Sequence, residues 1–130
     1  MKATGTIEVQ SWDEQTWDGR PYTEVSGAKL TMAVVTFKYT GDIEGTGTCR
    51  YLMSYDSDTS CETVGLEEIT GRIGSRSGTF VLRHVGAYRD GKVTGSFEVV
   101  GASGELAGMR GAGGAEWAET TATFTLEYDV

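Results

Sequence analysis

The chain has 130 residues, 38% of them hydrophobic, and its 19 acidic and 11 basic side chains give a formal net charge of −8. This length fits one domain with its own core, here residues 1–130. We expect no nucleic-acid or membrane partner, because such partners need clustered basic residues or an apolar run of about 20 residues. The opening MKATGTIEVQ also lacks the apolar core of a signal peptide.

Hydrophobic residues alternate with a period of two, which is typical of strands, and no amphipathic helix is predicted. Turn signals stand at 40–42, 55–60, 74–78 and 89–91. The sequence predicts an all-β meander of seven or eight strands, and residues 13–28 are expected to form a long polar loop. The alternating segments are 4–12, 48–55, 62–73, 78–88, 92–100 and 121–129.

Two early segments bear on partners and on access to the interior. Trp12 and Trp17 flank the start of the expected loop, where they either close over one end of the fold or anchor the loop. The run MAVVTF at 32–37 has no polar face, so both of its faces are expected to be covered. We therefore expect a homo-oligomer, a dimer, with this run in the contact between subunits.

Cys49 and Cys61 flank a predicted hairpin that turns near Asp58. In that hairpin the two residues do not face each other, and two cysteines do not make a disulfide framework. We predict reduced thiols and a cytoplasmic protein.

Glycine is abundant, with 19 residues against a single proline. Glycine weakens a flat sheet but allows the bends that strands of a small closed barrel need. We therefore predict a single closed antiparallel β-barrel. The glycines that lie inside strand patterns are Gly45, Gly47, Gly65, Gly71, Gly86 and Gly95.

The segment GASGELAGMRGAGG, residues 101–114, holds six glycines. It has no Gly-Lys-Ser/Thr ending and no βαβ unit around it, so a phosphate-binding loop is not expected. We predict a tight connection from a strand ending near Val100 to the last strand, starting at about Ala115. Leu106 and Met109 are expected to plug one end of the core.

A resemblance rests on GELAGMRGAGG together with YLMSYDSD, VGLEEITGRIGSRSGTFVLRHVGAY and the opening MKATGTIEVQSWDE. These motifs, in this order, resemble an uncharacterised bacterial family of unknown function with an allene-oxide-cyclase-like β-barrel. The glycine pattern is also similar to allene oxide cyclases and, more distantly, to dirigent proteins. The resemblance implies a barrel that binds apolar small molecules and guides their cyclisation without a cofactor. Thr59 and Phe97 depart from the family pattern, which favours glycine and tryptophan there.

Alternation separates the interior from the exterior when charged residues are taken to face outward. Glu67 and Glu68 are adjacent and face opposite sides, and the outward charges Glu62 and Arg72 favour Glu67 as the interior one. The resulting interior is mostly apolar with a few polar anchors, as in ligand cavities. The expected substrate-binding residues are Tyr51, Met53, Tyr55, Phe80, Leu82, Phe97 and Phe124.

His84 and Glu67 are the candidate catalytic residues, since histidine and a glutamate in an apolar barrel are both suited to general acid–base chemistry. Structural roles remain open: His84 as a hydrogen-bonded core residue, Glu67 as a bulge cap or partner of Arg110, and the tyrosines as packing. One histidine and two separated cysteines make no usual zinc site, so no metal and no cofactor are expected.

The sequence therefore predicts a barrel that binds an apolar small molecule. The favoured function is a cofactor-free isomerase, cyclase or lyase that works by acid–base chemistry. A carrier or sensor without chemistry, and a barrel whose interior is simply filled, are the alternatives.

Overall fold

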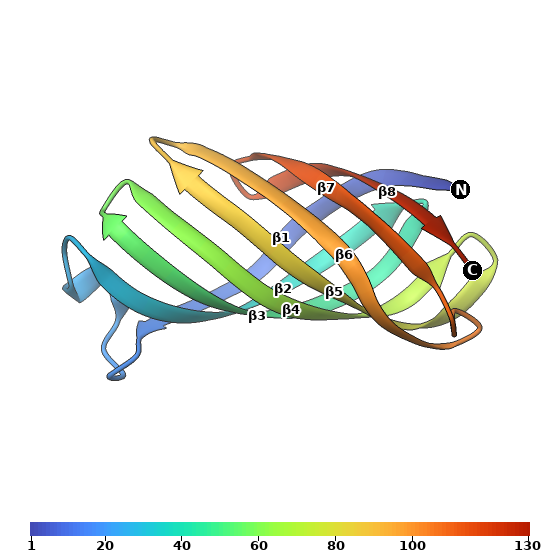
Figure 1. Ribbon diagram of the computed structural model, residues 1–130, viewed down its shortest axis with the longest axis horizontal. Coiled ribbons are helices and arrows are strands. Elements are labelled where there is room, and N and C mark those ends of the chain that lie inside the picture. Colours follow the sequence, from blue (N-terminus) through green and yellow to red (C-terminus); the bar gives the residue numbers. More distant parts are fainter.

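The computed structural model describes residues 1–130 as one closed antiparallel barrel of eight strands, which confirms the predicted architecture (Figure 1). Each strand pairs with its neighbours in the chain, and β8 closes the ring on β1. Closure pairs the two end strands of the meander with each other over Lys2–Glu8 of β1. The strands are β1 (Lys2–Thr16), β2 (Lys29–Gly41), β3 (Ile43–Ser57), β4 (Ser60–Ile73), β5 (Arg76–Arg89), β6 (Lys92–Gly104), β7 (Arg110–Ala118) and β8 (Thr121–Asp129).

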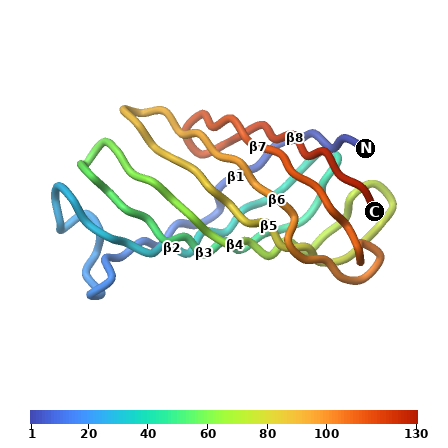
Figure 2. The backbone as a smooth tube through the Cα atoms, viewed as in Figure 1, coloured from blue at the N-terminus to red at the C-terminus, as the bar shows by residue number.

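The two ends of the barrel differ. Both termini lie at one end, where the amide of Tyr128 donates to the carbonyl of Met1. At this closed end Leu106 and Met109 are buried, as expected of a plug. The opposite end carries the β3–β4 and β5–β6 hairpins and the β1–β2 connection (Figure 2). We call this opposite end the mouth.

The prediction of a loop over 13–28 is wrong at its first residues, because β1 continues to Thr16, which pairs with Thr31 of β2. A β-bulge between Val9 and Ser11 inserts Gln10 as an extra residue. The inward side therefore changes from odd residues to even residues after the bulge. Polar residues in this segment fit a strand because the strand ends at the mouth.

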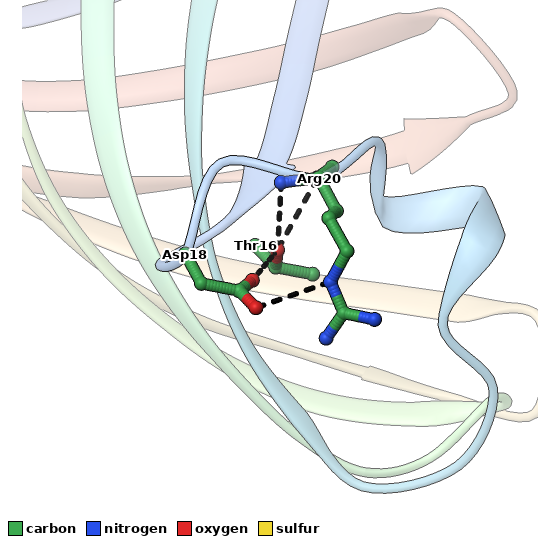
Figure 3. A network of polar contacts seen from close by, with 3 residues as sticks. All are labelled: Thr16, Asp18 and Arg20. Atoms are coloured by element: carbon green, nitrogen blue, oxygen red, sulfur yellow. Dashed lines mark hydrogen bonds and ion pairs between the residues drawn. The ribbon is translucent and has the colours of Figure 1, made fainter.

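The remaining β1–β2 connection is tied together by side chains and contains one short 3-10 turn, Tyr22–Glu24. The Thr16 hydroxyl donates to Asp18 and accepts the backbone N–H of Arg20 at 3.0 Å. Arg20 also pairs with Asp18 at 3.1 Å through its Nε atom (Figure 3). The connection thus leaves β1 in a defined turn beside the mouth.

The glycine-rich segment is mostly strand, so the prediction of a connection spanning 101–114 is wrong. β6 continues to Gly104 and β7 begins at Arg110, and a separate strand β8 follows β7. Strand pairing explains the glycines of β7: a Cβ on Gly113 would lie only 1.9 Å from the carbonyl oxygen of Thr125. Glycine there permits the backbones of β7 and β8 to approach closely.

Burial follows the predicted alternation. Glu67 is fully buried while Glu68 is exposed, which resolves which of the two faces inward. Cys49 lies opposite Glu67 and Cys61 opposite Tyr55, so the two buried thiols do not face each other and remain free, as predicted. The structure contains no helix with the length and hydropathy of a membrane span.

Candidate functional site

A cavity of about 560 Å³ opens at the mouth. Seven of its 23 lining residues are aromatic, and three connections at this end, β1–β2, β3–β4 and β7–β8, contribute Tyr22, Asp58 and Glu119. The space exists because two inward residues near the mouth, Gly86 and Gly95, have no side chain. In the closed half of the barrel, larger inward side chains fill the interior. The aromatic lining residues are Trp12, Tyr22, Phe37, Tyr51, Tyr55, Tyr88 and Trp117.

The sequence-predicted residues divide between the cavity and the packed core. Tyr51, Met53, Tyr55 and His84 line the cavity. Glu67 lies behind His84 and does not line it. Four predicted substrate-binding residues lie in the buried core and not in the cavity lining, namely Phe80, Leu82, Phe97 and Phe124. Their bulk fills the closed half of the barrel.

A buried polar cluster stands behind the cavity. His84 Nε2 lies 2.6 Å from Glu67 Oε1, and the hydroxyl of Tyr39 donates to both Glu67 oxygens at 2.9 and 2.8 Å. Glu67 is fully buried, and the His84 side chain is 14% exposed. Glu67 therefore neither caps a bulge through backbone N–H groups nor pairs with Arg110.

Strand register and two glycines explain how these side chains meet. His84 lies opposite Gly65 and is a diagonal neighbour of Glu67 across the β4–β5 pair, so the two side chains can reach each other. Tyr39 is on β2, with β3 between it and Glu67. Gly47 on β3 makes room, because a Cβ there would lie 2.0 Å from Glu67 Oε2.

Electrostatics keep the neighbours of Glu67 neutral. Burial, and then the negative charge of Glu67, raises the pKa of Tyr39 well above its usual value. Burial raises the pKa of Tyr51 well above its usual value, and the Cys49 thiol and Glu67 add to the effect. Burial followed by the charge of Glu67 also raises the pKa of the Cys49 thiol. His84 is thus the one neighbour that can carry a positive charge beside this carboxylate.

The hydrogen-bond pattern assigns the tautomer of neutral His84. An ionised carboxylate only accepts hydrogen bonds, so beside ionised Glu67 the neutral imidazole donates its Nε2–H, which leaves the lone pair on Nδ1. Every buried polar side-chain atom has a hydrogen-bond partner. His84 Nδ1 has no partner, so it is not buried and is open to the cavity. A histidine oriented by a carboxylate with its other nitrogen free is the arrangement of a general base.

Aromatic rings fix the orientation of the imidazole. Tyr51 and Phe97 each contact it edge to face, with ring centroids 5.8 and 5.6 Å away. Tyr51 also stacks on Trp12 at 6.3 Å, so a continuous aromatic wall runs from His84 to the rim. Phe97, which departs from the family pattern, supports His84 from inside the core.

Sequence reasoning missed two members of the site. Tyr39 lies two residues after Phe37, with the charged residue Lys38 between them. Extending the predicted strand beyond Phe37 would therefore have placed Tyr39 inside. Glu14 was assigned to a loop, yet it is buried on the wall of the cavity. In the sequence, the buried position of Glu14 is indicated only by the even-numbered row Trp12, Glu14 and Thr16. This row points inward only if a bulge precedes it. No group of three or more histidine, cysteine or acidic side chains could hold a metal ion.

The fold and cavity define a class: an eight-stranded antiparallel barrel that is filled at one end and hollow at the other. The family model described as "Protein of unknown function (DUF3224)" matches residues 3–128, and the chain belongs to this family. This confirms the resemblance to an uncharacterised bacterial family.

A solved structure supports the same assignment. The chain is similar to a protein of unknown function from the DUF3224 family of Shewanella oneidensis MR-1, with a TM-score of 0.79 and 25% sequence identity. The similarity covers 99% of this chain and 96% of the other. No curated protein matches the sequence.

Proposed function

We propose that the protein binds an apolar small molecule in the cavity at the mouth and moves a proton on it through His84. The reaction class is a cofactor-independent isomerisation, cyclisation or elimination. The observation that carries the proposal is the orientation of His84, whose Nε2 is held at 2.6 Å by buried Glu67 while Nδ1 is open to a cavity of about 560 Å³.

The polar cluster supplies what proton transfer requires. His84 Nδ1 accepts a proton from the bound molecule, and the negative charge of Glu67 stabilises the imidazolium that forms. The same nitrogen then returns the proton at another atom or to a leaving group. Tyr39 holds the Glu67 carboxylate in place, so Glu67 and Tyr39 act through His84.

Binding is tested by filling the cavity. Gly95 lines the cavity, and a Cβ there meets nothing closer than the Val85 carbonyl oxygen at 4.0 Å, so Gly95→Leu places a side chain in open space. Gly101→Leu is the matched control, because a Cβ there meets only Val81 at 3.8 Å and Gly101 does not line the cavity. Molecules that copurify with the protein are measured by native mass spectrometry. We expect Gly95→Leu to lose them and Gly101→Leu to keep them, and equal retention would exclude the cavity as the site.

Proton transfer is tested on the molecule that copurifies. In D2O, a ligand whose proton is removed and returned by His84 gains deuterium, and mass spectrometry measures the gain. We expect His84→Gln to slow this exchange by about 100-fold or more while the ligand stays bound. Binding without exchange or conversion in the unaltered protein would favour a carrier of apolar molecules instead.

We further propose that the protein forms a homodimer. An exposed apolar row crosses the outer face of β2–β5, and strand register places its members directly beside one another: Met32, Leu52, Val64 and Val85. Glu62, which pairs with Arg89 in its own chain, lies on the side of this row towards the mouth, and Arg50 lies on the side towards the closed end. A twofold axis along the apolar row brings these flanks together, and Arg50 has no acidic partner within its own chain.

The two free, buried thiols support a cytoplasmic location for this protein, because such thiols persist in a reducing compartment.

A further inference from the structure

Glu14 is a buried carboxylate on the cavity wall that has no cationic partner. Its exposure is 6%, and it accepts hydrogen bonds from the Thr31 hydroxyl at 2.6 Å, the Tyr55 hydroxyl at 2.7 Å and Trp12 Nε1 at 3.0 Å. All of these donors are neutral. Buried charges in proteins are usually paired, as Glu67 is with His84 when that histidine is protonated. The counter-ion of Glu14 is thus missing from the protein itself.

The rings around Glu14 are suited to a positive charge. Aromatic faces attract cations, and the attraction grows when the cation is shielded from water. The cavity already shows this chemistry, because Lys29 Nζ lies 4.8 Å from the ring centre of Tyr55 and 5.5 Å from that of Tyr22. Trp12 adds a further ring, and its stacking on Tyr51 fixes it beside the carboxylate.

Lys29 does not form an ion pair with Glu14. Its ammonium group donates to the backbone carbonyls of Tyr22 and Val25 at 2.9 and 2.6 Å, and it forms no ion pair with an acidic side chain. The other formally charged lining residues, Asp58 and Glu119, are acidic. The lining therefore carries more negative than positive charge, in agreement with the net charge of the whole chain.

We propose that the ligand of this cavity carries a cationic nitrogen, an amine or quaternary ammonium group on an apolar body, and that Glu14 is its counter-ion. This inference rests on the proposed function, since it names the class of molecule that the same cavity takes. The aromatic wall between Glu14 and His84 accommodates the apolar body, so that the cationic group and the atom that exchanges a proton lie at different points of one ligand.

The experiment compares three probes that share a benzyl group: benzyltrimethylammonium, benzyl alcohol and phenylacetate. Calorimetry on the full chain measures their affinities at low and at physiological salt. We expect the cation to bind about tenfold tighter than the alcohol, and phenylacetate to bind most weakly. Equal affinities for the cation and the alcohol would overturn the inference but leave the cavity as a binding site. Absence of binding by all three would overturn the proposed function as well.

Glu14→Gln tests the residue directly, because it keeps the size of the side chain and one of its two acceptor oxygens but removes the charge. We expect the cation to lose about tenfold in affinity and the alcohol to change little. Glu116→Gln is the matched control, because Glu116 is exposed on β7 and does not line the cavity, and less than about a twofold effect is expected there. A cation preference that survives Glu14→Gln would overturn the assignment. If that variant does not fold, the probe series on the unaltered protein still decides whether the ligand class is cationic.

Discussion

Removing the Glu67 side chain is expected to destabilise the barrel far more than removing its neighbour on the same strand. Glu67→Ala deletes the acceptor of two side chains, the hydroxyl of Tyr39 and the imidazole of His84. Tyr39 is 3% exposed, so water does not replace the lost partner. Glu68→Ala is the matched control, because Glu68 is the next residue, is exposed and points outward.

The magnitude follows from the contacts. A buried donor left without its acceptor costs about 1–3 kcal/mol, and breaking a buried charged pair by removing one partner costs about 3–5 kcal/mol in all. We therefore expect Glu67→Ala to lower the free energy of unfolding by about 3–5 kcal/mol. The exposed control is expected to change it by less than about 0.5 kcal/mol.

An isosteric variant separates hydrogen bonding from charge. In Glu67→Gln the side-chain oxygen still accepts from Tyr39, and the amide donates to His84 Nε2. We expect a loss of less than about 2 kcal/mol. The donated bond forces the imidazole proton onto Nδ1, so the nitrogen that faces the cavity becomes a donor, and proton abstraction from a ligand is expected to stop.

Urea denaturation at pH 7, followed by circular dichroism, measures all three variants, and equal m-values show that the comparison is valid. If the free energies of unfolding of Glu67→Ala and Glu68→Ala differ by less than about 1 kcal/mol, the polar cluster does not stabilise the interior and the expectation is refuted. If Glu67→Gln is as destabilising as Glu67→Ala, the stabilisation comes from the charge and not from the hydrogen bonds.

Three further outcomes are expected. Burial raises the pKa of Tyr39 well above 10.0, so above about pH 10 only the unfolded chain loses this proton, and the free energy of unfolding falls by up to about 1.4 kcal/mol per pH unit. In alkaline denaturation, Tyr39→Phe is expected to make this fall with pH less steep. An equally steep fall in the variant would contradict the raised pKa of Tyr39. Gly47→Ala places a Cβ 2.0 Å from Glu67 Oε2 and is expected to lower the free energy of unfolding by about 1–3 kcal/mol, whereas Gly95→Ala, with open space around it, should not lower it. Leu52→Lys in the exposed apolar row is expected to convert a dimer to a monomer in light scattering, and a monomeric unaltered protein would rule out the dimer.

The alternation of the sequence predicted which side of each strand faces inward over most of the chain. Glu67 and Glu68 were placed on opposite faces, with Glu67 favoured as the inward residue, and burial settles the choice for Glu67. The glycines inside the strand patterns correctly indicated a closed barrel. This success has a local cause, because side chains of a strand alternate whatever the strand pairs with.

The missed features depend on pairing between strands. The bulge at Gln10 shifts the inward side of β1 and brings Glu14 into the cavity, and it appears only in the register of β1 against β2. Tyr39 and Glu67 meet across β3 because Gly47 leaves a gap there. No local pattern reports what lies two strands away.

The sequence by itself thus determined an all-β, closed barrel, and it placed His84 inside and favoured Glu67 over Glu68 as the second inward residue. Only the tertiary structure decided that the barrel is filled at one end and hollow at the other. The inward side chains of eight strands share one interior, and the space left at any level depends on their combined volumes. Phe80 and Phe124 fill the closed half, whereas Gly86 and Gly95 leave space at the mouth.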